Sequence, residues 1–205
     1  MTSPWLRIPL ADYEAHMALP AVGQAEMLVE ELQRAMHPRV PASCAILGCA
    51  GGNGFEALAR AGVQRIAGID INSDYVAAAR RRHHTMAQLE LHVADIQRPI
   101  PGCAAVEWVY AGLVFEYVDV DRTLQALRPL CAAGGALTVV LQGPGPLAPV
   151  TPSRYASLQR LADTLVLQDA GAFTTRARAA GFVPKQARTR TLASGKRFDI
   201  LTFAP

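Results

Sequence analysis

The chain has 205 residues, a formal net charge of +3 at pH 7, and 51% hydrophobic and 18% charged residues. This length can bury the core of one domain, and the composition has no bias toward disorder. The longest apolar stretches are shorter than the roughly 20 residues that a membrane-spanning helix needs, and the N-terminus lacks the basic start and apolar run of a secretory signal. These features favour a globular protein of the cytoplasm, with no membrane partner.

The cysteines and histidines show no pattern typical of a metal site. The cysteines are widely spaced and form no CxxC pair, so we expect reduced, mostly buried thiols with no disulfide framework and no bound metal. His83 and His84 are adjacent on an arginine-rich segment, and we expect them and His92 to be surface residues. The cysteines are Cys44, Cys49, Cys103 and Cys131.

The C-terminal part of the chain is basic. From Gly171 onward there are seven Lys or Arg residues and one acid, Asp199. Such an end could attract an anionic substrate or a nucleic acid. The charges alternate with apolar residues, as on the outer face of strands, and aromatic interleaving suited to base stacking is absent. We therefore expect a solvated face and no nucleic-acid partner.

The first forty residues differ from the rest and predict an N-terminal helical lid or brace. An entry segment ends at Pro20, and the segment 21–36 then places apolar side chains on one helical stripe. Pro38 and Pro41 should end that helix. The stripe consists of Ala25, Leu28, Val29, Leu32 and Met36.

From Ser43 onward, short apolar runs alternate with helical segments. The runs are apolar on both faces, which is typical of a parallel sheet with helices covering both sides. The expected strands are 43–48, 64–70, 89–96, 107–115 and 135–142, and the expected helices are 54–62, 72–84 and 120–131. The second helix begins at Asn72 or Ser73, either of which can cap it.

The remainder of the chain predicts a loop, two helices and a hairpin. The loop 143–152 contains four prolines and could form one wall of a substrate site. Helical stripes follow in 153–165 and 172–182, the second of which ends at Gly181. The strand-like runs 183–192 and 197–204 suit a hairpin, so the sheet should finish with an antiparallel strand.

A glycine-rich loop, Ile46 to Gly54, lies between the first strand and the first following helix. Small residues there let the backbone approach a ligand, and the helix N-terminus offers unpaired amides. The loop alone leaves two families of cofactor-binding proteins and a purely structural turn open, and one of these families binds nicotinamide dinucleotides. The dinucleotide interpretation rests on Gly52, Gly54 and Ala57, which match G-x-G-x-x-G/A, with Asp70 near the expected distance.

Five segments in order resemble the motifs of the class I S-adenosylmethionine-dependent methyltransferases. They are LGCAGGNG at 47–54, Asp70 at the end of the second strand, HVADI at 92–96, WVYAGLVFEYV at 108–118 and PLCAAGGALTVV at 129–140. The resemblance implies a Rossmann-like α/β fold: a mostly parallel seven-stranded sheet with a C-terminal antiparallel hairpin and helices on both faces. It implies a single methyltransferase domain, 1–205, with a lid (1–40), a cofactor-binding half (43–142) and a substrate-side part (143–205).

The resemblance also implies a site for S-adenosylmethionine, with Asp70 on the ribose hydroxyls and Asp95 and Ile96 on the adenine. The implied cofactor-binding residues are Tyr13, Met17, Gly48, Cys49, Ala50, Gly51, Gly52, Asp70, Ile71, Asn72, Asp95, Ile96, Ala111 and Gly112. His16, Glu116 and Tyr117 are the candidates on the substrate side. We expect methyl transfer to a small-molecule acceptor by a monomer or homodimer.

Two positions depart from the family pattern. The acid expected two positions before the first glycine is Ile46, and the second glycine is Ala50. The loss of the acid leaves the amino group of the cofactor without an identified partner. It motivates one alternative, a binding module that holds S-adenosylmethionine or S-adenosylhomocysteine without turnover. A nicotinamide-dependent oxidoreductase is the other alternative.

Overall fold

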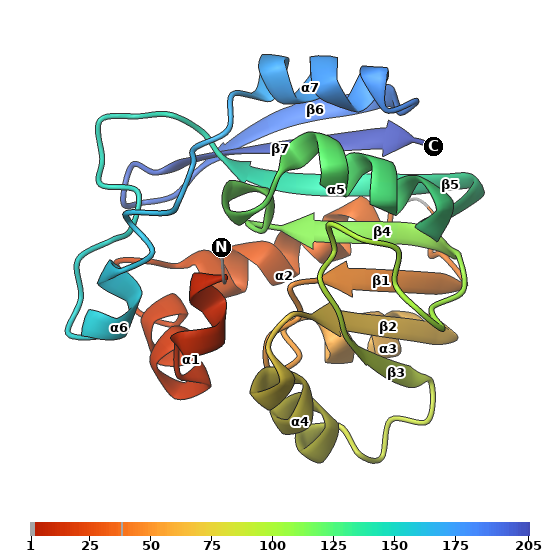
Figure 1. The fold of residues 1–205 in the computed structure, drawn as a ribbon, viewed down its shortest axis with the longest axis horizontal. Coiled ribbons are helices and arrows are strands. Elements are labelled where there is room, and N and C mark those ends of the chain that lie inside the picture. The colour runs from red at the N-terminus through yellow and green to blue at the C-terminus, as the bar shows by residue number, and fades with distance from the viewer. Residues whose placement is uncertain (1–2, 38) are drawn as a thin grey trace.

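The computed structural model describes residues 3–37 and 39–205. Its core is a seven-stranded sheet of order β3-β2-β1-β4-β5-β7-β6 (Figure 1). The first five strands pair in parallel, and β7 pairs antiparallel with both β5 and β6. This confirms the predicted sheet and hairpin. The strands are β1 Ser43–Leu47, β2 Arg65–Asp70, β3 Leu89–Val93, β4 Val106–Gly112, β5 Cys131–Gln142, β6 Val183–Thr191 and β7 Arg197–Ala204.

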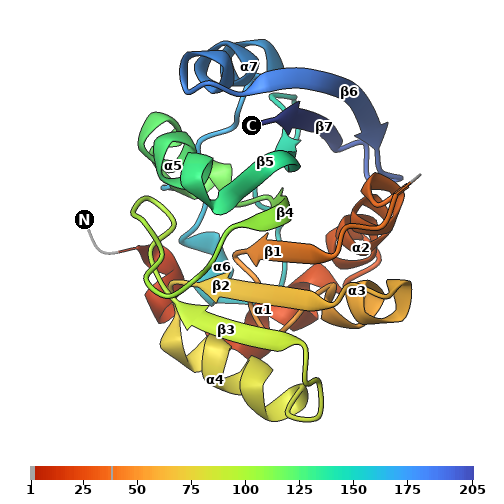
Figure 2. The same cartoon turned by 90° about the vertical axis from the view of Figure 1, so that its right-hand side faces the viewer.

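Helices cover both faces of the sheet, with α2, α3 and α4 on one side and α5 and α7 on the other (Figure 2). Successive residues of a strand point to opposite faces, so Cys44 and Ile46 pack in the cluster with α2 and α3. Ala45 and Leu47 pack in the cluster with α5 and α7. The helices are α1 Leu10–Met17, α2 Gln24–Ala35, α3 Phe55–Ala61, α4 Ser73–Arg82, α5 Val120–Leu127, α6 Ala156–Gln159 and α7 Ala170–Ala179.

The predicted helix ends are mostly confirmed. Asn72 is the residue that caps α4, since its side chain accepts the amides of Asp74 and Tyr75. Gly62 follows α3 in the left-handed conformation, as a C-terminal glycine does. The helix α2 ends at Ala35, before Pro38, and Pro38 itself lies outside the described residues.

The predicted helix 153–165 is wrong in length. Only Ala156–Gln159 is α-helical, and turns follow it. The apolar spacing was nevertheless informative, because Leu158 and Leu161 are buried together with Ile8 from the N-terminal segment. Packing against a remote segment, rather than a continuous helical face, therefore explains this pattern.

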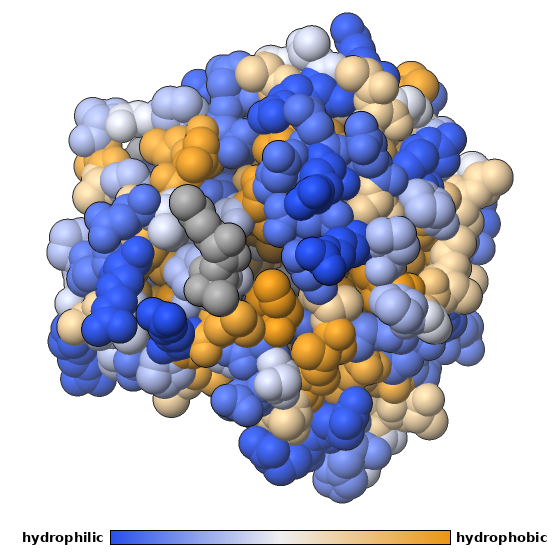
Figure 3. Space-filling view, viewed as in Figure 1, coloured by the Kyte–Doolittle hydropathy of each residue, from blue (hydrophilic) through white to orange (hydrophobic). Residues whose placement is uncertain are grey.

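The carboxyl ends of the parallel strands lie at one edge of the sheet, on the left in Figure 1, where α1 and α6 also lie. Ligands of open α/β sheets bind at this edge. In the same view the molecular surface is hydrophilic over α5, while hydrophobic residues gather near the centre (Figure 3). Among the described residues, no helix is long and apolar enough to cross a membrane.

Candidate active site

A cavity of about 1090 Å³ opens at the carboxyl edge of the sheet. One part of its lining comes from the segments that follow β1, β2 and β3 and from Gly112 at the end of β4. The other part comes from α1, Glu116 and Tyr117, the loop after β5, the segment around α6 and the β6–β7 turn. We call these the cofactor side and the acceptor side. The proline-rich loop contributes Pro149, Val150 and Thr151, so its predicted place in a wall is confirmed.

The glycine loop turns at the floor of the cofactor side. Gly48 and Ala50 line the cavity, and both have left-handed backbone, with φ of 64° and 48°. An L residue is strained in that region, so Ala50 costs backbone energy as well as a methyl of clearance. Ile46 packs in the cluster with α2 and α3 and is not among the cavity-lining residues. The position that carries the family acid is therefore part of the core.

Asp70 ties the glycine loop to the end of β2. Its Oδ2 accepts the amide of Ala50 and its Oδ1 accepts the amide of Asn72, each at 2.9 Å. The residue is 6% exposed, and burial raises the pKa of its carboxyl group, opposed by these backbone hydrogen bonds. A carboxylate has about four lone-pair sites, so two remain for a ligand.

The N-terminal segment is fastened across this side. Trp5 packs edge-on against Tyr13 and Tyr117, with ring centroids 5.4 and 5.0 Å away. Its carbonyl accepts the side-chain amide of Asn72 at 2.8 Å. In addition, Glu14 of α1 forms an ion pair with Arg82 of α4. The predicted lid therefore contacts the segments after β2 and β4.

The ion pair of Glu14 and Arg82 lies directly over Gly51, where a Cβ atom would collide with both side chains. At Gly52, a Cβ atom would meet His83 and Phe55 instead. These two glycines therefore serve close packing of the loop against α1 and α4.

Glu116 is the most deeply buried acid of the acceptor side. It is 2% exposed, and its Oε1 accepts the amide of Gln142 at 2.7 Å. Its Oε2 has no hydrogen-bond partner among the described residues. Burial raises the pKa of this carboxyl group to about 7, partly offset by backbone hydrogen bonds. A carboxyl group with such a pKa exchanges a proton readily near neutral pH.

His16 and Lys196 face the same part of the cavity. The Nδ1 of His16 lies 3.0 Å from the hydroxyl of Ser153, and burial followed by the nearby Lys196 charge lowers the histidine pKa. The ammonium of Lys196 donates to the carbonyl of Pro149 at 2.7 Å. Burial lowers the pKa of Lys196 to about 8. Histidine is thus held neutral beside a buried cation.

Most residues predicted for the site line the cavity. They are Tyr13, His16, Met17, Gly48, Ala50, Asp70, Ile71, Asp95, Ile96, Gly112, Glu116 and Tyr117. Five others do not line it: Cys49, Gly51, Gly52, Asn72 and Ala111. Sequence reasoning missed Trp5, Gln24, Gln142, Thr151 and Lys196. Lys196 belongs to the basic C-terminal part, but the expectation of a solvated face is wrong for this residue, which is 6% exposed.

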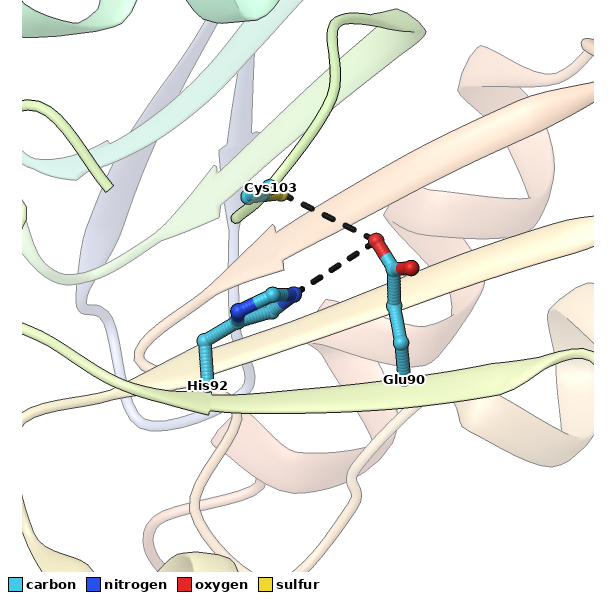
Figure 4. Close-up of side chains that lie close together, drawn as sticks. All are labelled: Glu90, His92 and Cys103. Atoms are coloured by element: carbon cyan, nitrogen blue, oxygen red, sulfur yellow. Dashed lines mark hydrogen bonds and ion pairs between the residues drawn. The ribbon is translucent and has the colours of Figure 1, made fainter. Parts of the chain in front are cut away.

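A second cluster lies away from the cavity, where Glu90, His92 and Cys103 approach within 4.8 Å of one another (Figure 4). Their donor atoms could hold a metal. However, Arg65 already donates at 2.8 Å to Oε1 of Glu90, the oxygen that approaches His92 and Cys103. The guanidinium satisfies the carboxylate and would repel a divalent cation. The expectation that His92 is a surface residue is wrong, because its side chain is only 17% exposed.

Comparison with known proteins agrees with this geometry. Residues 46–139 match the family model described as a methyltransferase domain. No curated protein sequence matches the chain. Among solved structures, an S-adenosylmethionine-dependent methyltransferase from Mesorhizobium loti has 18% identity and a TM-score of 0.70, covering 87% of this chain and 98% of its own.

Two further structures have the same fold. The N-methyltransferase NodS from Bradyrhizobium japonicum, solved with S-adenosylhomocysteine, has 16% identity and a TM-score of 0.69, over 91% of this chain and 88% of its own. A geranyl diphosphate methyltransferase solved with its substrate and sinefungin has 12% identity and a TM-score of 0.67, over 87% and 78%. Residues 46–139 therefore match a methyltransferase domain, and the chain has the fold of S-adenosylmethionine-dependent methyltransferases of known structure. This match favours a methyltransferase over the nicotinamide-dependent alternative.

Proposed function

We propose that the chain is one methyltransferase unit that transfers the methyl group of S-adenosylmethionine to a small molecule held on the acceptor side. The cavity volume supports this, because sites for small ligands measure about 300–1,000 Å³ and 1090 Å³ leaves room for two molecules. Geranyl diphosphate methyltransferase and its substrate show that relatives in fold act on small molecules.

The residues of the cofactor side fit a nucleoside. Asp70 has two unoccupied lone-pair sites for the ribose hydroxyls, and Asp95 and Ile96 lie on the neighbouring strand end for the adenine. Gly48, Ala50 and Gly112 would border the methionine part. Bound S-adenosylmethionine supplies an electrophilic methyl group on a sulfonium. The protein then needs to align the acceptor, exclude water and remove a proton where the acceptor carries one.

Glu116 is our candidate for that proton acceptor. Its Oε2 is buried without a partner, and its pKa of about 7 suits proton transfer at neutral pH. His16 and Tyr117 would contact the acceptor, and Tyr13 and Met17 would close over the methionine end. The lid contacts of Trp5 would exclude water from the reacting atoms.

Asp70 carries the proposal, and Asp70→Asn tests it. The substitution keeps one carboxamide oxygen for a backbone amide but replaces a charged acceptor of the ribose by a donor. Loss of charged hydrogen bonds should weaken S-adenosylhomocysteine binding by about 2–3 kcal/mol, measured by calorimetry. Asp74→Asn, two residues into α4, is the matched control because Asp74 is exposed. An unchanged dissociation constant would show that the ribose contact is assigned wrongly.

Unfolding must be measured on both variants, because Asp70 also holds the amides of Ala50 and Asn72. Asp70→Ala would leave both amides unpaired, so it confounds binding with folding. Equal losses of stability and binding in Asp70→Asn would indicate a structural role only.

One observation favours the alternative of a binding module without turnover. The position of the family acid is occupied by Ile46, which does not line the cavity. Labelled S-adenosylmethionine and a metabolite extract distinguish the two functions. Transfer of label into the extract supports the enzyme. Tight binding with no transferred label supports the module.

A further inference from the structure

Lys196 is a buried cation on the acceptor side. It lies in the turn between β6 and β7, at the edge of the sheet where β5 ends. The residue is 6% exposed and lines the cavity. Its ammonium donates to the carbonyl of Pro149. A neutral carbonyl satisfies one of three donors and does not balance the charge.

No carboxylate pairs with this ammonium among the described residues. Asp199, the nearest acid along β7, is engaged by Thr189 and Arg197 instead. Glu116 accepts a backbone amide, and Asp70 accepts two. A buried charge without a counter-ion is costly, so an anionic ligand that pairs with this ammonium would be favoured.

The polar residues near Lys196 in the cavity lining add no second charge. Thr151 lines the cavity two residues after Pro149, and the carbonyl of Pro149 is already shared with the side-chain amide of Gln142 at 3.0 Å. His16 is kept neutral, so it adds a hydrogen-bonding group and no second charge. An imidazole and an ammonium together match the oxygens of an anion.

We propose that Lys196 binds an anionic group, a carboxylate or a phosphate, of the methyl acceptor. This inference rests on the proposed function, because the anionic group belongs to the molecule that receives the methyl group. It assigns the class of that substrate. The cofactor side spans the ends of β1 to β4, whereas Lys196 lies beyond β5. The anion would therefore anchor the end of the acceptor that is remote from the methyl group, and the other end would reach Glu116.

The composition of the chain allows a direct test, because Lys185 and Lys196 are its only lysines. Lys185 is exposed on β6 of the same hairpin. Protein carrying ¹³C-labelled lysine side chains gives two ε-carbon signals, which Lys185→Met and Lys196→Met assign. The labelled protein, saturated with S-adenosylhomocysteine, is titrated with formate, acetate and benzoate, then with their neutral twins formamide, acetamide and benzamide, and finally with inorganic phosphate.

We expect at least one anion to shift the Lys196 signal with saturation while its neutral twin does not, and the Lys185 signal to stay unchanged. Carboxylates and phosphate, tested separately, show which source of negative charge the site prefers. If every anion shifts the two lysines alike, or the amides act as well as the acids, the inference is overturned.

The substitution supplies a second readout. Lys196→Met should weaken binding of the effective anion by about tenfold or more, because a charged hydrogen bond is lost. Its affinity for S-adenosylhomocysteine should match that of Lys185→Met, and equal unfolding midpoints show that both variants fold. Failure of S-adenosylhomocysteine to bind the wild type would refute the proposed function. Normal binding of it without an anion response refutes only the role of Lys196.

Discussion

The two sides of the cavity differ in how far apart in the sequence their hydrogen-bonded residues lie. On the cofactor side, Asp70 holds Ala50 and Asn72, so the hydrogen-bonded groups lie in two neighbouring strand–helix turns. On the acceptor side, His16 meets Ser153 across 137 positions of sequence, and Lys196 meets Pro149 from a hairpin turn. The first side is a continuous motif on a rigid sheet. The second is assembled by packing, which lets the same fold accept different substrates.

The largest expected effect separates methyl transfer from cofactor binding. Glu116→Gln keeps the oxygen that accepts the amide of Gln142 but cannot take a proton. We expect kcat/KM for methyl transfer to fall by about 10²–10³-fold, with S-adenosylhomocysteine affinity unchanged. In the wild type, kcat/KM should rise with pH up to about 7, the pKa of Glu116, and the variant should lose this rise.

Glu56→Gln is the control for this experiment, because Glu56 is an exposed acid on α3. It should leave both the rate and the pH profile unchanged. If Glu116→Gln weakens cofactor binding as much as Asp70→Asn does, the two sides of the cavity are not separable.

Glu116→Gln and Glu56→Gln also test how pH affects the free energy of unfolding. The folded-state pKa of Glu116, about 7, lies above the ordinary glutamate value of 4.5, so the buried acid is most stable when protonated. Its contribution is complete below pH 4.5 and is lost as pH rises toward 7. Relative to Glu116→Gln, the wild type should therefore lose up to about 3 kcal/mol of unfolding free energy over this range. Urea unfolding at pH 5 and pH 8 measures it, and Glu56→Gln should show no such trend.

A smaller effect is expected on the cofactor side, from the strained loop. Ala50→Gly restores a residue that adopts φ of 48° without strain. We expect a gain of about 0.5–1 kcal/mol in unfolding free energy, after the entropy that glycine adds to the unfolded chain. Ala172→Gly, at an exposed position in α7, should instead destabilise the protein. A loss of stability in Ala50→Gly would mean that the methyl group packs favourably enough to outweigh its backbone strain.

The smallest effect concerns the lid over the cofactor side. Arg82→Met removes the ion pair with Glu14, whose side chains are 47% and 37% exposed. An exposed pair contributes little, so we expect a loss below about 1 kcal/mol that shrinks as salt is added. Arg60→Met, which removes the more exposed pair with Glu56, is the control. A larger, salt-independent loss would show that the lid depends on this contact.

The sequence predicted the cofactor side in more detail than the acceptor side. The strand end at Asp70, the loop at Gly48 and the hairpin follow from local spacing, and the structure confirms these elements. The fourth strand ends at Gly112 and not at Phe115 as predicted. The prediction for 153–165 was wrong because its apolar residues pack on Ile8 rather than along a continuous helix. Glu116 and His16 were candidates by position alone, and Lys196 was not a candidate.

The sequence by itself therefore determined the order of strands and helices and the position of the glycine loop after β1, because strand and helix periods and turn residues act over a few positions. Only the tertiary structure decided that Ile46 faces the core, that Ala50 is strained, and that Glu116 keeps an unpaired oxygen. It also decided that Lys196 is buried with no carboxylate partner among the residues that the structure describes. Burial and pairing depend on segments more than a hundred residues apart, as the contact of His16 with Ser153 shows, and no local pattern encodes them.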